Sequence, residues 1–162
     1  MVIFALQPFF SQAQENPSRL DISAGFSIPE TFNLGGRWQY NNNGSLHLKL
    51  GSNFNINDIY YSATVNHCWC FGKLSKKTNK RMWGFNTGYT LSFVNNSHRE
   101  GYSSFLNLYF SREFKLADKL FIEPELGASF PAFNNTFIKD DHYEGYNLMI
   151  IAKFGINMIY CF

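Results

Sequence analysis

Long apolar runs, net charge and cysteine are all scarce in this chain. The 162 residues contain no apolar run of the length, about 18 residues, that a membrane-spanning helix needs, and the mean hydropathy is −0.23. The formal net charge is only +2, which gives no basis for nucleic-acid binding. The three cysteines are odd in number, so they do not indicate a disulfide framework. A helical membrane protein, a nucleic-acid reader and a disulfide-stabilised domain are therefore not expected.

Aromatic residues, in contrast, are abundant. They make up 19% of the chain, with 18 Phe and 9 Tyr, which is unusual for a small soluble domain. A transmembrane β-barrel accounts for both the high aromatic content and the modest hydropathy. Only alternate residues of its strands face lipid, and aromatic residues form girdles at both interfaces. The length is that of one domain.

The last ten residues, 153–162, show the clearest pattern of the chain. Every second residue is apolar or aromatic, and the residues between them are more polar. A period of two over this length predicts a strand with one apolar face and one polar face. The apolar face consists of Phe154, Ile156, Met158, Tyr160 and Phe162.

The same alternation recurs along the chain from Arg19. Turn residues such as Asn41-Asn42-Asn43-Gly44 separate the alternating segments, and Asn and Gly suit tight hairpins. The pattern predicts an all-β fold, a closed antiparallel up-and-down transmembrane β-barrel of about eight strands over 19–162. The predicted strands are 19–28, 31–40, 45–54, 59–71, 81–94, 102–114, 119–130 and 153–162.

A strand of this kind that ends in Phe resembles the closing strand of bacterial outer-membrane β-barrels, which the barrel-assembly machinery recognises. The whole segment 19–162 resembles the small barrels of the OmpA/OmpX type. The resemblance implies a fold, outer-membrane lipid as surroundings, the assembly machinery as a partner, and periplasmic termini. It implies no active site.

The beginning of the chain is expected to be a signal-peptide remnant. Residues 1–13 contain a short apolar run and end in Ser11-Gln12-Ala13, which predicts cleavage after Ala13. The basic segment that normally begins a signal peptide is missing, so we expect the true start codon to lie further upstream; the alternative is an apolar tail on the mature protein. Residues 14–18 are predicted to be a short periplasmic lead.

Loop lengths predict which connections face outside the cell. With both termini in the periplasm, the tight turns at 41–44 and 115–118 face the periplasm and the long loop 131–145 faces outside, as outer-membrane barrels prefer. The connection at 29–31 is short for an outer loop, and the one at 72–80 is long for an inner turn. We expect any ligand or partner to meet the loop 131–145.

Two residues do not suit the pattern. Pro124 falls in the middle of a predicted strand, where it cannot donate to the ladder, so we expect a bulge or a strand that has left the bilayer there. His67 falls on the apolar face, next to Trp69, where an interface would accommodate its polar tip. The alternative fold is a soluble barrel of the lipocalin kind, in which the apolar face lies inside.

Charged residues fall on the polar face of the predicted strands. An eight-stranded barrel has an interior just wide enough for side chains, so these charges are expected to pair in a structural salt-bridge plug; the alternative is a narrow ion path. A carboxylate pair for glycoside hydrolysis, Glu123 and Glu125, lacks an open cleft. The predicted lumen charges are Asp21, Arg37, Lys49, Glu113, Glu123, Glu125 and Lys153.

No catalytic, metal or cofactor site is predicted. The cysteines Cys68, Cys70 and Cys161 all fall on the inner face, and two cysteines two apart on one strand are poorly placed for a disulfide. The histidines show no ligand spacing. Three functions stay open: a non-enzymatic structural or surface-interaction barrel, which we favour; an outer-membrane lipid-modifying enzyme, which would need Ser, His and an acid at the outer rim; and a narrow pore.

Overall fold

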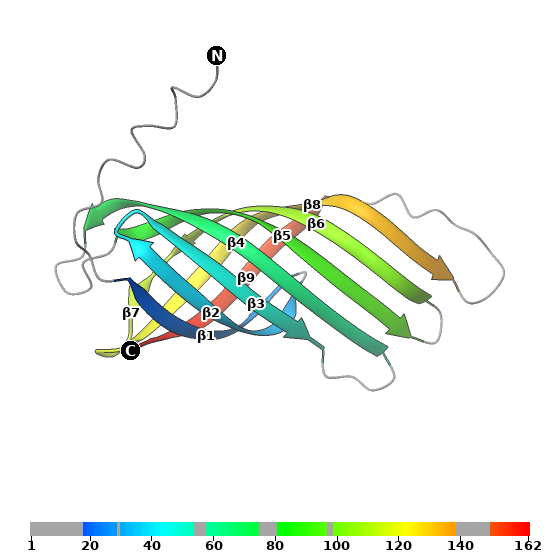
Figure 1. Ribbon diagram of the computed structural model, residues 1–162, viewed down its shortest axis with the longest axis horizontal. Helices are drawn as coiled ribbons and strands as arrows, with labels where there is room; N and C mark the ends of the chain where they lie inside the picture. The colour runs from blue at the N-terminus through cyan, green and yellow to red at the C-terminus, as the bar shows by residue number, and fades with distance from the viewer. Residues whose placement is uncertain (1–17, 29, 54–57, 75–80, 97–98, 139–149) are drawn as a thin grey trace, which may run out of the picture.

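The structure is a computed structural model, and it describes residues 18–28, 30–53, 58–74, 81–96, 99–138 and 150–162. The described residues form one closed, antiparallel β-barrel (Figure 1). Its strands are β1 (Arg19–Ser27), β2 (Thr31–Asn41), β3 (Gly44–Ser52), β4 (Asp58–Leu74), β5 (Arg81–Asn96), β6 (Arg99–Arg112), β7 (Phe114–Lys115), β8 (Leu120–Ile138) and β9 (Ile151–Cys161).

The barrel wall consists of eight long strands. Each pairs with its neighbour in the chain, β6 pairs with β8, and β9 pairs with β1 to close the ring. The two-residue strand β7 continues the direction of β6 along the edge of β8. The predicted all-β, up-and-down barrel of eight strands is therefore confirmed. Among the described residues there is no helix long and apolar enough to cross a membrane.

The two faces of the wall are opposite in polarity. Large apolar side chains cover the outside, and polar or charged side chains fill the inside. The period of two along each strand produces this division, because successive side chains point to opposite faces. All five predicted outward residues of the last strand are 45–66% exposed: Phe154, Ile156, Met158, Tyr160 and Phe162.

The two ends of the barrel also differ. The start of β1, the C-terminus and the β2–β3 turn lie at one end, which we call the terminal end (Figure 1). At the far end, β4, β5, β6 and β8 extend beyond the rest of the wall (Figure 1). These strands have 14 to 19 residues, whereas β1, β2, β3 and β9 have 9 to 11. The far rim is therefore uneven.

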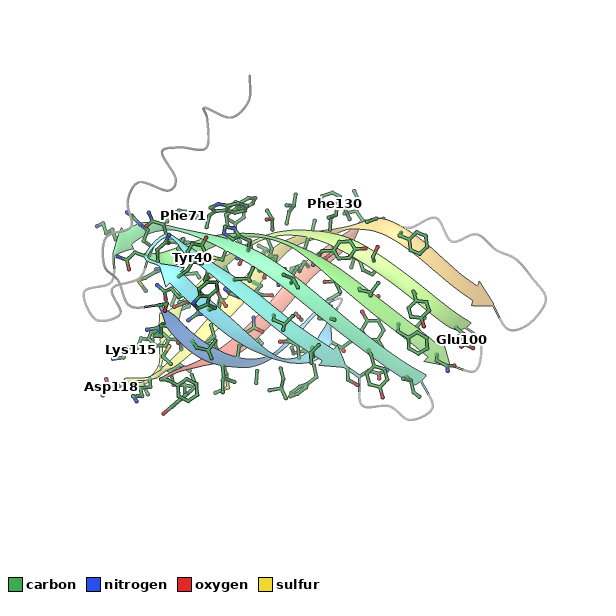
Figure 2. The ribbon with its side chains drawn as sticks, in the orientation of Figure 1. Tyr40, Phe71, Glu100, Lys115, Asp118 and Phe130 are labelled. Carbon is green, nitrogen blue, oxygen red and sulfur yellow. The ribbon has the colours of Figure 1, made fainter. Side chains whose placement is uncertain are left out.

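Both tight turns lie where the sequence predicts them. β2 ends at Asn41 and β3 begins at Gly44, and the Asn43 backbone N–H donates to Oδ1 of Asn41 at 2.8 Å. The turn after β7 is held by hydrogen bonds from the backbone N–H groups of Leu116 and Ala117 to the Leu120 carbonyl, at 2.9 and 3.1 Å. Both turns lie at the terminal end, beside Tyr40 and Lys115 in Figure 2.

The loop predicted at 131–145 starts later in the structure than the sequence suggested, because β8 extends to Ile138. Residues 131–138 belong to β8 and pair with β6. Pro131 suggested the end of the strand, but the ladder shifts by one residue between Ser104 and Phe105 and continues beyond it. A β-bulge of this kind admits a proline into a strand. The remainder of the loop, 139–145, lies outside the described residues, as do the predicted signal remnant 1–13 and most of the predicted lead 14–18.

Pro124 lies within β8, and the bulge that is one of the two expectations for it is absent from the described β8–β9 ladder. Its pairing with Ile156 of β9 is in register with the pairs on both sides. On its other side, the ladder stops after Ser111 and Glu125 and resumes at Phe114 and Ile122. Proline has no N–H for this ladder, and the interruption separates β6 from β7. The missing hydrogen bond therefore coincides with the end of β6, while the pairing of β8 with β9 stays in register.

Candidate functional site in the barrel lumen

The predicted lumen charges all lie inside the barrel, and all are buried. Their exposed fractions are 6% or less. An eighth charged residue, Glu30, joins them with 1% exposure. The buried charged residues of the lumen are Asp21, Glu30, Arg37, Lys49, Glu113, Glu123, Glu125 and Lys153.

The first ion cluster lies towards the terminal end and is centred on Arg37 of β2. Arg37 donates two hydrogen bonds to Oδ2 of Asp21 on β1, from Nε at 2.9 Å and from Nη2 at 2.6 Å. Its Nη1 bonds Oε1 of Glu113, which follows β6. Strands β2 and β6 lie on opposite sides of the eight-stranded ring, so this guanidinium joins facing walls. Arg19, at the mouth of the lumen, lies 2.8 Å from Asp21.

The second ion cluster contains both lumen lysines. Lys49 Nζ on β3 donates to Oε1 of Glu125 on β8 at 2.6 Å. Lys153 Nζ on β9 lies 2.6 Å from each carboxylate oxygen of Glu30 and 3.9 Å from Oε2 of Glu125. Asn157 adds a hydrogen bond from Nδ2 to Oε1 of Glu125 at 2.8 Å. Every buried cation is therefore matched with at least one buried carboxylate, as burial requires.

Sequence reasoning missed Glu30 because it lies between β1 and β2, where strand alternation assigns no direction. Thr31, which follows it, has a φ of 60°, in the left-handed region that a β-branched residue rarely adopts. The Thr31 hydroxyl donates to the Glu30 carbonyl at 2.7 Å. A Cβ added to Gly51 of β3 would collide with the same carbonyl. A glycine on the inner face of a strand often marks a close approach of another part of the backbone. Gly51 was therefore the one residue of the sequence that could have indicated the inward position of Glu30.

The lumen carries an excess of negative charge. Among the described residues, five buried carboxylates face three buried cations, a formal excess of two negative charges. Arg19, partly exposed at the mouth, offsets one of them through Asp21. The lumen is therefore expected to attract cations and to repel anions.

The lumen has two sectors. The charged sector comprises the inner faces of β1, β2, β3, β8 and β9, with Glu30 and the β6–β7 junction. The neutral sector comprises the inner faces of β4, β5 and β6, whose described buried side chains are all uncharged. The neutral sector contains Ser62, Thr64, Asn66, Cys68, Cys70, Asn86, Thr90, Ser92, Phe105, Asn107, Tyr109 and Ser111.

Hydrogen bonds in the neutral sector join neighbouring strands. The Thr64 and Thr90 hydroxyls lie 2.7 Å apart, and Asn107 Nδ2 donates to Thr90 Oγ1 at 2.8 Å. Asn86 Nδ2 donates to Ser111 Oγ at 3.0 Å. The Thr90 hydroxyl also donates to Glu30 Oε1 at 3.3 Å, which connects the two sectors.

The geometry favours a filled lumen over a pathway. Ion pairs cross the interior from β2 to the β6–β7 junction and from β3 to β8, and eight strands leave room for little besides side chains. A Ser and His pair does exist, since Ser45 Oγ lies 2.9 Å from His47 Nε2. This pair lies inside the lumen beside the β2–β3 turn, at the terminal end, whereas a lipid-modifying enzyme would need it at the outer rim.

Aromatic side chains form a row on the outside near the terminal end. His67 is a polar residue on this apolar face. Its Nε2 lies 2.5 Å from the Tyr40 hydroxyl oxygen, and its ring centroid lies 4.3 Å from that of Trp69. Its polar tip is therefore hydrogen-bonded. The row includes Trp38, Tyr40, His67, Trp69, Phe85 and Phe110.

The three cysteines lie inside the barrel and all are described; none forms a disulfide. Cys68 and Cys70 are on β4, and Cys161 is on β9, on the opposite side of the ring. Cys161 packs with Phe121 and Ile159 in a small apolar cluster. Within the described residues, no group of three or more His, Cys, Asp or Glu side chains is arranged to hold a metal ion.

Comparison with family models, with curated proteins and with solved structures found no match to this chain.

Proposed function

We propose that the chain is a small integral β-barrel of the bacterial outer membrane, of the OmpA/OmpX type, with both termini in the periplasm. The observation that carries this proposal is the polarity of the wall, which is apolar outside and charged inside. A soluble ligand-binding barrel would need the reverse distribution. Exposed apolar surface on this scale normally marks contact with lipid or protein, and alternation around a closed ring is the pattern of transmembrane barrels.

The aromatic side chains support the same proposal. Transmembrane barrels concentrate aromatic residues at both membrane interfaces. Here the row from Trp38 to Phe110 lies near the terminal end, and Phe93 and Tyr102 pack at 5.0 Å between ring centroids on the extended half of the wall. Tyr160 and Phe162 also pack against each other, at 5.4 Å, at the C-terminus.

The role that fits this geometry best is structural or surface-interacting and not enzymatic. The ion pairs across the lumen favour a plug over a pore, so we expect no stable conductance in planar lipid bilayers. The far end, with its extended strands β4, β5, β6 and β8, would face outside and present the connections after β3, β5 and β8 to a partner.

Heat-modifiability tests the proposal. The full chain is refolded into detergent micelles or lipid vesicles and run unheated and boiled on a denaturing gel. We expect the unheated protein to migrate differently, and we expect this shift to be lost when Phe162 is deleted or Tyr160 is changed to Lys. Cys161→Ser, between them but on the inner face, is the control that should keep the shift. A chain that stays monomeric and folded without detergent would overturn the proposal.

A substitution at the centre of the wall separates lipid from water more directly. Leu48, the central residue of β3, is 54% exposed. Leu48→Arg is expected to lower folding stability in vesicles by about 2–4 kcal/mol, the cost of a cation facing the bilayer midplane. Leu116→Arg is the matched control, since Leu116 is 57% exposed in the turn after β7. Equal tolerance of both substitutions would indicate an exterior that faces water.

A further inference from the structure

Cys68 and Cys70 bring two sulfur atoms together inside the barrel. They are two apart on β4, so both side chains point into the lumen, and they are 2% and 6% exposed. Their Sγ atoms are 3.6 Å apart. A disulfide needs about 2.05 Å, and residues two apart on an extended strand cannot reach that distance without bending the backbone.

The same separation suits two ligands of one metal ion. In a tetrahedral zinc site each Zn–S bond is about 2.3 Å, which places neighbouring sulfurs roughly 3.8 Å apart. The Cys68 and Cys70 sulfurs therefore need to move by only a few tenths of an ångström. We propose that Cys68 and Cys70 form a two-thiolate binding site for a soft divalent cation of the zinc group.

A buried amide side chain lies on the strand next to this pair. Asn86 of β5 is directly opposite Cys68 in the β4–β5 ladder and is fully buried. Its Nδ2 donates to Ser111 Oγ, but its Oδ1 has no hydrogen-bond partner within the described part of the chain. Because the described residues offer no third Cys, His, Asp or Glu at this site, water and the Asn86 oxygen are the ligands left for the remaining positions.

The Cys68 sulfur can lie close to the backbone of β5 because residue 84 is a glycine without a side chain. A Cβ at Gly84 would lie 2.6 Å from Cys68 Sγ, 2.9 Å from Ser111 Oγ and 3.4 Å from Asn86 Nδ2. The Cys68 Sγ, Ser111 Oγ and Asn86 Nδ2 atoms therefore all lie beside Gly84, on the inner faces of β4, β5 and β6. The site lies near the terminal end, because the backbone N–H of Cys70 donates to the Asn43 carbonyl of the β2–β3 turn at 2.7 Å.

Charge favours a divalent cation here. Thiolates, not thiols, are the metal ligands, so binding breaks two S–H bonds, forms two S–metal bonds and releases two protons to solvent. Two thiolates neutralise a divalent ion, which leaves no uncompensated charge in the neutral sector. The excess of carboxylates elsewhere in the lumen adds long-range attraction for a cation. Binding of a metal ion at these two thiolates does not require that the exterior of the barrel face lipid.

Cadmium is the probe for this site. The reduced full chain, refolded in detergent micelles, is titrated with Cd²⁺ while the ultraviolet thiolate-to-metal charge-transfer absorbance is recorded. We expect saturation at one Cd²⁺ per chain for the wild type and for Cys161→Ser, and loss of the absorbance in Cys68→Ser and in Cys70→Ser. Absence of the band in the wild type, or an unchanged titration in either variant at position 68 or 70, would overturn the proposal.

Two further measurements guard against a folding defect in the cysteine variants. Gly84→Ala keeps all three cysteines but displaces the Cys68 sulfur, and it is expected to weaken Cd²⁺ binding by about tenfold or more, which is 1.4 kcal/mol. Cd²⁺ should also protect Cys68 and Cys70, but not Cys161, from alkylation in the wild type, as mapped by peptide mass spectrometry. Equal alkylation of all three with and without Cd²⁺ contradicts the site.

Discussion

The charged and neutral sectors of the lumen hold the barrel together in different ways. In the charged sector, Arg37 and Lys49 each bond a carboxylate on the opposite wall. In the neutral sector, the bonds among Thr64, Thr90, Asn86, Asn107 and Ser111 run between adjacent strands, which the backbone ladder already joins, whereas the longer bond from Thr90 to Glu30 leaves the sector. The ion pairs therefore fix the distance between facing walls, whereas the neutral hydrogen bonds reinforce contacts that exist without them.

This difference predicts unequal sensitivity to substitution. A charge that loses its partner in the charged sector stays buried and uncompensated, which is the most costly defect that the lumen permits. A lost hydroxyl or amide in the neutral sector costs at most the desolvation of one neutral group. Substitutions in the two sectors test the comparison, and the largest effect is expected at Lys153.

Lys153→Met should destabilise the barrel most. Lys153 is fully buried and lies 2.6 Å from both oxygens of Glu30, and methionine of similar length leaves that carboxylate without its cation. We expect a loss of about 3–5 kcal/mol in the free energy of unfolding. Urea unfolding in detergent micelles, followed by tryptophan fluorescence, measures it.

The double variant Lys153→Met with Glu30→Gln is the control for this prediction. It removes the buried negative charge together with its partner, and the glutamine keeps an acceptor for the Ser27 hydroxyl, which lies 3.0 Å from Glu30 Oε2. We expect it to recover a large part of the lost stability. A double variant no more stable than Lys153→Met alone would show that the lysine stem, and not the charge pair, stabilises the lumen.

Alternation along the strands was sufficient to predict the fold and most of the lumen. Each predicted charge lies inside because a period of two assigns every strand residue to one face. The ion pairs that cross the lumen could not be predicted from the sequence, because they depend on the stagger of the strands around the ring. Neither Arg37 with Glu113 nor Lys49 with Glu125 follows from spacing, because each pair is 76 residues apart.

Connections were harder to predict than strands. Glu30 was missed because its direction depends on the backbone of Thr31 and on the space above Gly51. β8 was predicted too short because Pro131 resembles a strand breaker, whereas a one-residue shift in the ladder near Ser104 accommodates it. Both errors occur where local backbone geometry, and not side-chain periodicity, determines the structure.

Thr90→Val should have an intermediate effect, since Thr90 lies where the sectors meet. Valine keeps the shape but removes the hydroxyl that accepts from Asn107 at 2.8 Å and lies 2.7 Å from the Thr64 hydroxyl. We expect a loss of about 1–2 kcal/mol in the free energy of unfolding, measured in the same assay. Thr90→Ser, which keeps the hydroxyl, should lose less. Equal losses would show that the Thr90 methyl group contributes as much to stability as its hydroxyl group.

Asn66→Leu should have the smallest effect and the opposite sign. Asn66 is fully buried on β4, and among the residues that the structure describes neither its Nδ2 nor its Oδ1 has a hydrogen-bond partner. Leucine of similar volume gives up no hydrogen bond and removes a buried polar group, so we expect stability within about 1 kcal/mol of the wild type, on the stabilising side. Asn86→Leu is the matched comparison, because Asn86 Nδ2 donates to Ser111 at 3.0 Å, and it should destabilise. If Asn66→Leu costs as much as Asn86→Leu, the two amides are equally hydrogen-bonded in solution, and the expected difference between them is wrong.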